Sequence, residues 1–132
     1  MYVRGIRGAT TVQRNDEVEI LEETRRLLDA IVRENDIVPD DIACVLITVT
    51  QDLNATFPAQ AIRQMPGWEL VPLMCSLEID VPGGLPRCIR LMVMVNTDKR
   101  QTEIRHVYLN DARRLRPDLA GSPLDKNPTL SV

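Results

Sequence analysis

At 132 residues the chain has the length of a single domain, large enough to bury a core without a disulfide or a metal. Its formal net charge of −3 lacks the basic excess that phosphate backbones attract, which argues against nucleic acid as a general partner. Only 3% of the residues are aromatic, so the core must be built from Val, Ile, Leu, Met and Ala.

The chain shows no signal for a membrane or a metal. No segment approaches the roughly 18 apolar residues of a membrane span, and MYVRGIRGATT lacks the apolar stretch of a secretion signal. We therefore expect a cytoplasmic protein. Cys44, Cys75 and Cys88 form no CxxC pair, and His106 is the only histidine, so we predict no metal site.

The first half of the chain predicts a strand, a helix, a second strand and a short helix. Residues 3–12 are rich in β-branched residues and Gly, and their alternation places Arg7 on one face with Gly5 and Ala9. A helical period runs from Asp16 to about Asn35. The apolar run at 42–50 indicates a central strand, and the proline at 58 begins a short helix over 59–65.

The second half predicts a strand over 68–75, a loop carrying Glu78, the turn VPGGLP, a strand over 88–95 and a short strand over 105–109. The domain is expected to span 1–119, with 120–132 as a flexible tail. This order indicates an α/β or α+β fold with a mixed five-stranded sheet, covered by one long and one short helix. A single helical layer covers one face only, and the other face is also apolar, which favours oligomerisation.

Arg90 is the residue that most needs explanation. It shares a strand face with Cys88, Met92 and Met94, where an unpaired guanidinium is costly. Two interpretations stay open: Glu78 or an acid from a neighbouring subunit neutralises Arg90, or Arg90 binds an anionic ligand.

Other polar residues favour the ligand. Arg7 and Tyr108 lie inside strands, and Arg63 projects from the short helix, so three arginines with Tyr108 and Glu78 suit a small polyanion. The sequence has no GxSxG, GxGxxG, P-loop or HExxH motif. Cys75 has no evident histidine partner as a nucleophile, and His106 alone is a weak candidate for a general base. An enzyme built from these residues would need no nucleophile, metal or cofactor.

Four motifs together carry a family resemblance: RGIRGATTV at 4–12, TQDLNATFPAQAIR at 50–63, CSLEIDVPGGLPRCIR at 75–90, and IRHVYL with LRPDL at 104–119. Over about residues 2–119 the chain resembles the monofunctional, trimeric chorismate mutases with a pseudo-α/β-barrel. The resemblance implies a cofactor-free Claisen rearrangement of chorismate to prephenate, in the shikimate pathway to Phe and Tyr. It also implies a homotrimer with active sites at the subunit interfaces.

The resemblance further implies roles for individual residues. Arg90 would bind the ether oxygen, Arg7 and Tyr108 the side-chain carboxylate, and Glu78 with Cys75 the ring hydroxyl. In this interpretation the turn VPGGLP brings Glu78 and Arg90 to opposite sides of the cavity. The substrate-binding positions at the wall and mouth of the pocket would be Phe57, Arg63, Leu73, Met74 and Arg116. Gln60 stands where the family often has a lysine, and Met74 stands where a smaller polar residue is expected.

Three alternatives remain beside the mutase. A trimeric binding or regulatory module could use the same arginines to sense a small carboxylate. An enzyme of similar trimeric shape that processes imines or enamines would also need an arginine against a carboxylate, but not Glu78 with Cys75. In the third alternative, all of these charges are structural ion pairs.

Overall fold

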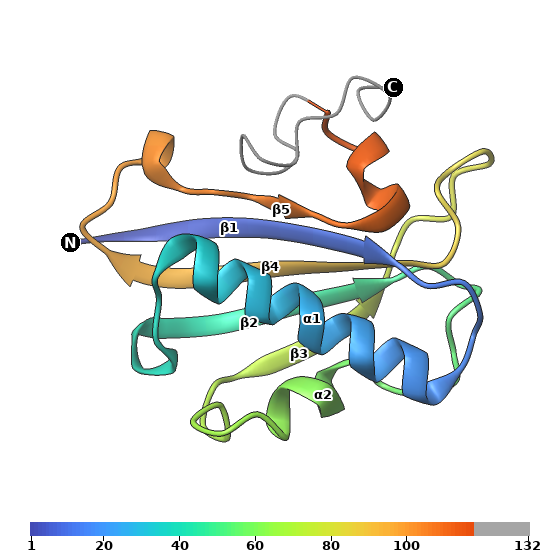
Figure 1. The fold of residues 1–132 in the computed structure, drawn as a ribbon, viewed down its shortest axis with the longest axis horizontal. Helices are drawn as coiled ribbons and strands as arrows, with labels where there is room; N and C mark the ends of the chain where they lie inside the picture. Colours follow the sequence, from blue (N-terminus) through green and yellow to red (C-terminus); the bar gives the residue numbers. More distant parts are fainter. Residues whose placement is uncertain (118–132) are drawn as a thin grey trace.

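Five strands form one mixed sheet in the computed structural model, which describes residues 1–117 (Figure 1). Antiparallel β4 lies between β2 and β1, while β2 pairs with β3 and β1 pairs with β5 in parallel, giving the order β3-β2-β4-β1-β5. The predicted α+β class with a mixed five-stranded sheet is confirmed; the predicted tail at 120–132 lies outside the described residues. The strands are β1 (Tyr2–Thr11), β2 (Ile42–Val49), β3 (Leu73–Leu77), β4 (Cys88–Thr97) and β5 (Val107–Tyr108).

The long helix begins and ends as its sequence predicts. In α1 (Glu17–Asn35), the side chain of Asp16 accepts a 3.0 Å hydrogen bond from the N–H of Glu19, which caps the first turn. The helix stops where Asp36 takes a left-handed conformation with φ of 51°. The short helix α2 (Ala59–Arg63) follows Pro58, and three 3₁₀ turns complete the set: η1 (Pro39–Asp41), η2 (Gln101–Glu103) and η3 (Asn110–Arg114).

Both α-helices pack on the same face of the sheet (Figure 1). Helix α1 approaches β1 very closely at Gly8, where an added Cβ would lie 2.5 Å from Cδ1 of Ile31 and 3.2 Å from Cδ1 of Leu27. Only a residue without a side chain fits between the strand and the helix here. The buried core lies in this layer and is made of aliphatic side chains, including Ile6, Ile20, Leu28, Ile47, Ile89 and Val93.

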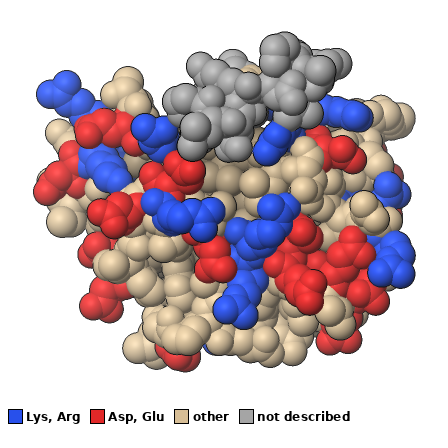
Figure 2. All heavy atoms as spheres, viewed as in Figure 1, with Lys and Arg blue, Asp and Glu red and all other residues tan. Residues whose placement is uncertain are grey.

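The two surfaces of the chain differ in character. On the side that α1 covers, acidic and basic side chains are intermixed (Figure 2), as expected for a solvated helix surface. On the opposite face of the sheet, no α-helix of residues 1–117 covers the strands; Ala112 of η3 packs near β1 and β5, while Leu46 of β2 and Met74 of β3 are exposed. An uncovered apolar sheet face of this kind is typical of an interaction surface.

Two predicted strands are shorter than the sequence pattern indicated. The strand predicted over 68–75 starts only at Leu73, because residues 64–71 form successive turns, with the N–H of Val71 bonded to the carbonyl of Trp68 at 3.2 Å. Trp68 is buried in these turns rather than in the sheet. The strand predicted over 105–109 is reduced to Val107–Tyr108, because the main chain of Arg105 binds the side chain of Asn35 instead of a strand.

Candidate active site

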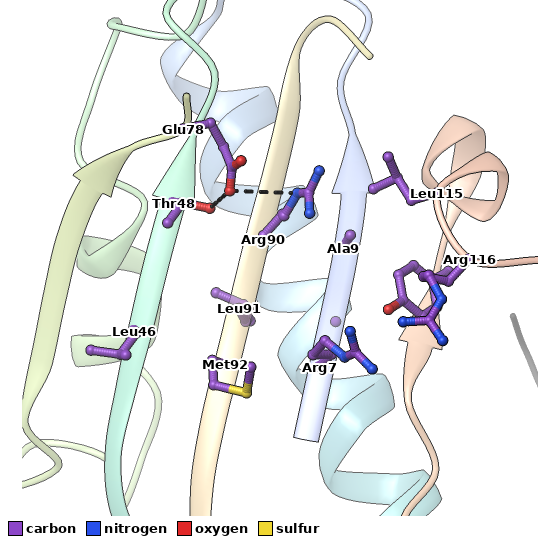
Figure 3. Close-up of a pocket in the computed structure, with 12 residues that line it drawn as sticks. Arg7, Ala9, Leu46, Thr48, Glu78, Arg90, Leu91, Met92, Leu115 and Arg116 are labelled. Atoms are coloured by element: carbon purple, nitrogen blue, oxygen red, sulfur yellow. Dashed lines mark hydrogen bonds and ion pairs between the residues drawn. The ribbon is translucent and has the colours of Figure 1, made fainter. Parts of the chain in front are cut away.

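The uncovered face of the sheet is hollowed over β4 and β1 (Figure 3). Side chains that alternate away from the helices, such as Arg90 and Met92 of β4, form the floor of a cavity of about 410 Å³. Its polar groups come from six separate places in the chain, which the fold brings together: Arg7, Thr48, Glu78, Arg90, Tyr108 and Arg116.

Arg90 and Glu78 are in contact within the cavity. Oε1 of Glu78 lies 3.5 Å from Nε of Arg90 and accepts a 2.6 Å hydrogen bond from Oγ1 of Thr48 (Figure 3). The expectation that the two residues lie on opposite sides of the cavity is therefore wrong. The Arg90 side chain is still 45% exposed, so the ion pair leaves much of the guanidinium accessible to an anion.

Arg7 and Tyr108 form the other end of the cavity. The register pairs Ala9 of β1 with Arg90 on one side and with Tyr108 on the other, so β1 carries Arg7 between β4 and β5. Tyr108 is only 4% exposed and packs in a small apolar cluster with Ala9, Cys88 and Ala112. Its ring is consequently held at the cavity wall.

The charge balance of the cavity favours a small anion. Within residues 1–117, three guanidinium groups and one carboxylate line it, beside apolar surface from Leu46, Met92 and Leu115. Arginine binds carboxylates through a planar, two-pronged set of donors, and low-dielectric apolar walls strengthen that interaction. The arrangement suits a compact molecule with one or two carboxylates and an apolar ring.

Two nearby titratable groups are held neutral. Burial raises the pKa of the Cys88 thiol to about 11, although Arg90 opposes this shift, so Cys88 is not a thiolate at neutral pH. The pKa of His106 is lowered by burial and then by Arg7 and Arg116. Among residues 1–117, no group of three or more His, Cys, Asp or Glu side chains is arranged to hold a metal ion.

The remaining predicted site residues do not line this cavity. Phe57 is 70% exposed and Met74 is 68% exposed, while Arg63 is exposed at the end of α2. Leu73 and Met74 belong to β3, at the opposite edge of the sheet from β5. With neighbouring strands about 4.8 Å apart, β3 and β1 are separated by roughly 14 Å within one chain.

Cys75 lies on β3 with its side chain on the helix-covered face. It pairs with Ile47, which is buried in the core, so the thiol does not lie beside Glu78 in a single chain. Along β3, the main-chain groups of successive residues point alternately toward β2 and toward the open edge of the sheet. The hydrogen bond from the N–H of Val45 to the carbonyl of Pro72 shows that Pro72 points toward β2. By that alternation, the main-chain N–H and carbonyl of Cys75 point to the open edge of the sheet.

Sequence reasoning missed Thr48 and Leu115. Thr48 lies directly opposite Arg90 in the β2–β4 register, a neighbour relation that only the strand order reveals. Leu115 follows η3 and packs against the cluster around Tyr108. A polar residue within the apolar run 42–50 was the available signal for Thr48.

No helix within residues 1–117 is both long and apolar enough to cross a membrane.

The fold and the site define a small α+β protein whose open sheet face carries an arginine-lined cavity suited to a compact anion. The chain belongs to the chorismate mutase type I family, whose model matches residues 3–119. Its activity is that of a chorismate mutase, an isomerase of aromatic amino acid biosynthesis, and its substrate is chorismate. This membership decides between the enzyme and the alternatives that the sequence left open.

Individual relatives agree with the family model. The chain is 52% identical to the chorismate mutase AroH of Bacillus subtilis over 98% of this chain and 100% of that protein. It is 49% identical to the chorismate mutase AroH of Thermus thermophilus over 89% of this chain and 96% of that protein. A solved chorismate mutase from Clostridium thermocellum is 53% identical and superimposes with a TM-score of 0.81, covering 83% of this chain and 97% of that one.

Proposed function

We propose that the protein rearranges chorismate to prephenate in the cytoplasm, as a homotrimer whose active sites each combine residues of two subunits. The proposed homotrimer is supported by the separation of the candidate site residues into two groups on one sheet. The cavity group surrounds the cavity and consists of Arg7, Glu78, Arg90, Tyr108 and Arg116. The β3-edge group lies near or on the β3 edge and consists of Phe57, Arg63, Leu73, Met74 and Cys75. An oligomer of this chain can unite the two groups.

Arg90 is the proposed catalytic cation. In the rearrangement an ether C–O bond breaks as a C–C bond forms, and negative charge grows on the ether oxygen in the transition state. A guanidinium already fixed beside that oxygen stabilises the transition state more than the ground state. The accessible part of the Arg90 side chain can bind this oxygen and an adjacent carboxylate.

The other cavity residues bind and orient the substrate. Arg7 and Tyr108 hold the side-chain carboxylate, which selects the folded conformer in which the two reacting carbons meet. Glu78, held by the hydroxyl of Thr48, accepts from the ring hydroxyl and faces the positive charge that develops on the ring. Arg116 contributes positive potential at the mouth of the cavity.

The second group is proposed to close the cavity from the neighbouring subunit. Exposed Phe57 and partly buried Leu73 would wall the ring, and Arg63 would add a cation at the entrance. Cys75 would bind the ring hydroxyl through its open-edge main-chain N–H, with its thiol adjacent. The exposed side chain of Met74 would be buried in the same contact, as apolar surface on an uncovered sheet requires.

The cytoplasmic location rests on thiol chemistry. Cys44, Cys75 and Cys88 are all free cysteines, and unpaired thiols persist in reducing compartments. An enzyme of amino acid biosynthesis that acts on a soluble metabolite fits the same compartment.

The decisive experiment mixes two inactive variants. Arg90→Ala removes the cation of the cavity group, and Arg63→Ala together with Phe57→Ala removes two members of the β3-edge group. After unfolding and refolding a 1:1 mixture, we expect about a quarter of wild-type activity. Three in four randomly assembled trimers are mixed, and each mixed trimer contains one site in which both groups are intact.

Arg90→Ala mixed with Glu78→Ala serves as the matched control. Both changes fall in the cavity group, so no mixed trimer regains a complete site and activity should stay at the level of the separate variants. Recovery of activity in the control, or its absence in the first mixture despite a trimeric mass, contradicts the proposed division of the site. Loss of chorismate absorbance without added metal or cofactor is the assay throughout.

A further inference from the structure

The segment that carries Tyr108 is attached to β1 by a short main-chain ladder, which includes a 2.9 Å hydrogen bond from the N–H of Leu109 to the carbonyl of Ala9, and to the rest of the chain by side chains. Strand β5 contains only Val107 and Tyr108, which is too short to fix its own position on β1. Just before it, the side chain of buried Asn35 binds both main-chain groups of Arg105, accepting from its N–H at 2.8 Å and donating to its carbonyl at 2.9 Å.

His106 supplies the second attachment. Its Nδ1 accepts a 2.9 Å hydrogen bond from the main-chain N–H of Arg7, on the neighbouring strand β1. The bond joins the residue two positions before Tyr108 directly to the backbone of Arg7. A change in this contact therefore alters the distance between Arg7 and Tyr108 at the cavity.

The hydrogen bond requires a neutral imidazole with the proton on Nε2, because a protonated Nδ1 cannot accept. The charged groups that face His106 are Arg7 from β1 and Arg116 from the segment after η3; together with burial they lower its pKa. Protonation would thus break the contact and place a third cation beside two guanidinium groups.

We propose that His106 is a positioning residue: its neutral imidazole holds Arg7 and Tyr108 at the spacing that captures the substrate carboxylate. This inference rests on the proposed function, in which those two residues share one carboxylate. It predicts that substrate capture weakens on the acid side of neutrality. The sign follows from the acceptor, which is present above the pKa of His106 and is lost as the pH falls through it.

Two variants of His106 distinguish the effect of the hydrogen-bond acceptor from the effect of the titratable group. His106→Asn places an amide oxygen near the position of Nδ1 and does not titrate, whereas His106→Leu keeps similar bulk and has no acceptor. At pH 7.5 we expect His106→Asn to stay within about threefold of wild type in KM, and His106→Leu to raise KM about tenfold, with kcat changed less.

The dependence of KM on pH tests the proposal, because a purely structural role of His106 would not change it. Between pH 5 and 8 the substrate carboxylates stay ionised, since ordinary carboxyl pKa values are near 4. The informative quantity is the difference in KM between two proteins that share every other titratable group. We expect KM of the wild type to rise more steeply on acidification than KM of His106→Asn.

A second measurement does not depend on activity. His106 is the only histidine, so its ring resonances in the wild-type protein are assigned without further variants. We expect them to titrate below the ordinary value of about 6.5. Titration at or above that value overturns the inference, as does an equal acid dependence of KM in the wild type and in His106→Asn.

The outcomes distinguish this inference from the proposed function. A wild-type protein without mutase activity overturns the proposed function, and the resonance titration then decides the state of His106 alone. An active wild type with His106→Leu kinetically identical to it overturns the positioning role only. If His106→Leu does not assemble, the comparison of wild type with His106→Asn still decides.

Discussion

The carboxylate of Glu78 lies 3.5 Å from Nε of Arg90 and is held at the same oxygen by the hydroxyl of Thr48. This relation answers how an arginine can stand on an apolar strand face. The neighbouring carboxylate offsets part of its charge and orients the guanidinium, while the exposed remainder of the side chain is available to a ligand. The ion pair is therefore compatible with binding, rather than an alternative to it.

Removing the Arg90 cation should abolish most of the turnover. We expect Arg90→Ala to lower kcat at least about a hundredfold, because it withdraws the donor from the oxygen on which charge develops. Arg90→Lys retains the charge but not the planar fork, so kcat should also fall by at least about tenfold. The measurement is loss of chorismate absorbance under saturating substrate.

Arg25→Ala is the matched control for Arg90, since Arg25 lies exposed on α1, paired only loosely with Asp29 at 3.9 Å. Its kcat should equal that of the wild type. An Arg90→Ala protein that folds, assembles and turns over normally would exclude Arg90 as the catalytic cation.

Thr48 should matter through Glu78. Thr48→Val is nearly isosteric and removes the 2.6 Å hydrogen bond to the carboxylate, which leaves Glu78 free to move. Hydrogen bonds to charged groups contribute roughly 1.5–3 kcal/mol, so we expect kcat/KM to fall about tenfold or more. Thr48→Ser keeps the hydroxyl and should retain most of the activity; equal losses in both variants would indicate a packing effect instead.

Gln60 offers a test of electrostatic steering. Its side chain accepts only a 3.3 Å hydrogen bond from Thr56, and Gln60→Lys adds a cation on the exposed side of α2, beside Arg63. We expect kcat/KM to rise severalfold at low ionic strength and to depend more steeply on salt, with kcat unchanged.

Gln64→Lys makes the same change in net charge one helical turn later, where Gln64 lies beside α1 residues such as Leu21 and Arg25. If both lysines raise kcat/KM equally, the gain comes from net charge and not from the mouth of the site. Kinetics across a series of salt concentrations separate these outcomes.

The contact at Gly8 is testable through stability. Gly8→Ala places a Cβ 2.5 Å from Cδ1 of Ile31, so the Ile31 side chain or the helix that carries it must shift. We expect a loss of roughly 1–3 kcal/mol in the free energy of unfolding, measured in urea at one fixed protein concentration. Ile31→Val removes Cδ1, so the double variant should be more stable than the sum of the single effects predicts. Strict additivity would contradict close packing at this contact.

The sequence by itself determined the elements and the chemistry. Alternation along the strands predicted that Arg90 shares a face with Met92, and that Arg7 shares one with Gly5 and Ala9. Asp16 and Asn35 predicted the ends of α1 because capping depends on local backbone groups. The clustered arginines with Glu78 and Tyr108 predicted a small anionic ligand.

The tertiary structure decided which strands are neighbours, and with that which side chains meet. Alternation assigns a residue to a face but does not say which strand lies beside it, so the pairing of Thr48 with Arg90 was not predictable. The burial of Trp68 in the core and the bond from the backbone of Arg7 to His106 were hidden for the same reason. Both depend on contacts between residues far apart in the chain, and these form only when the sheet order β3-β2-β4-β1-β5 is complete.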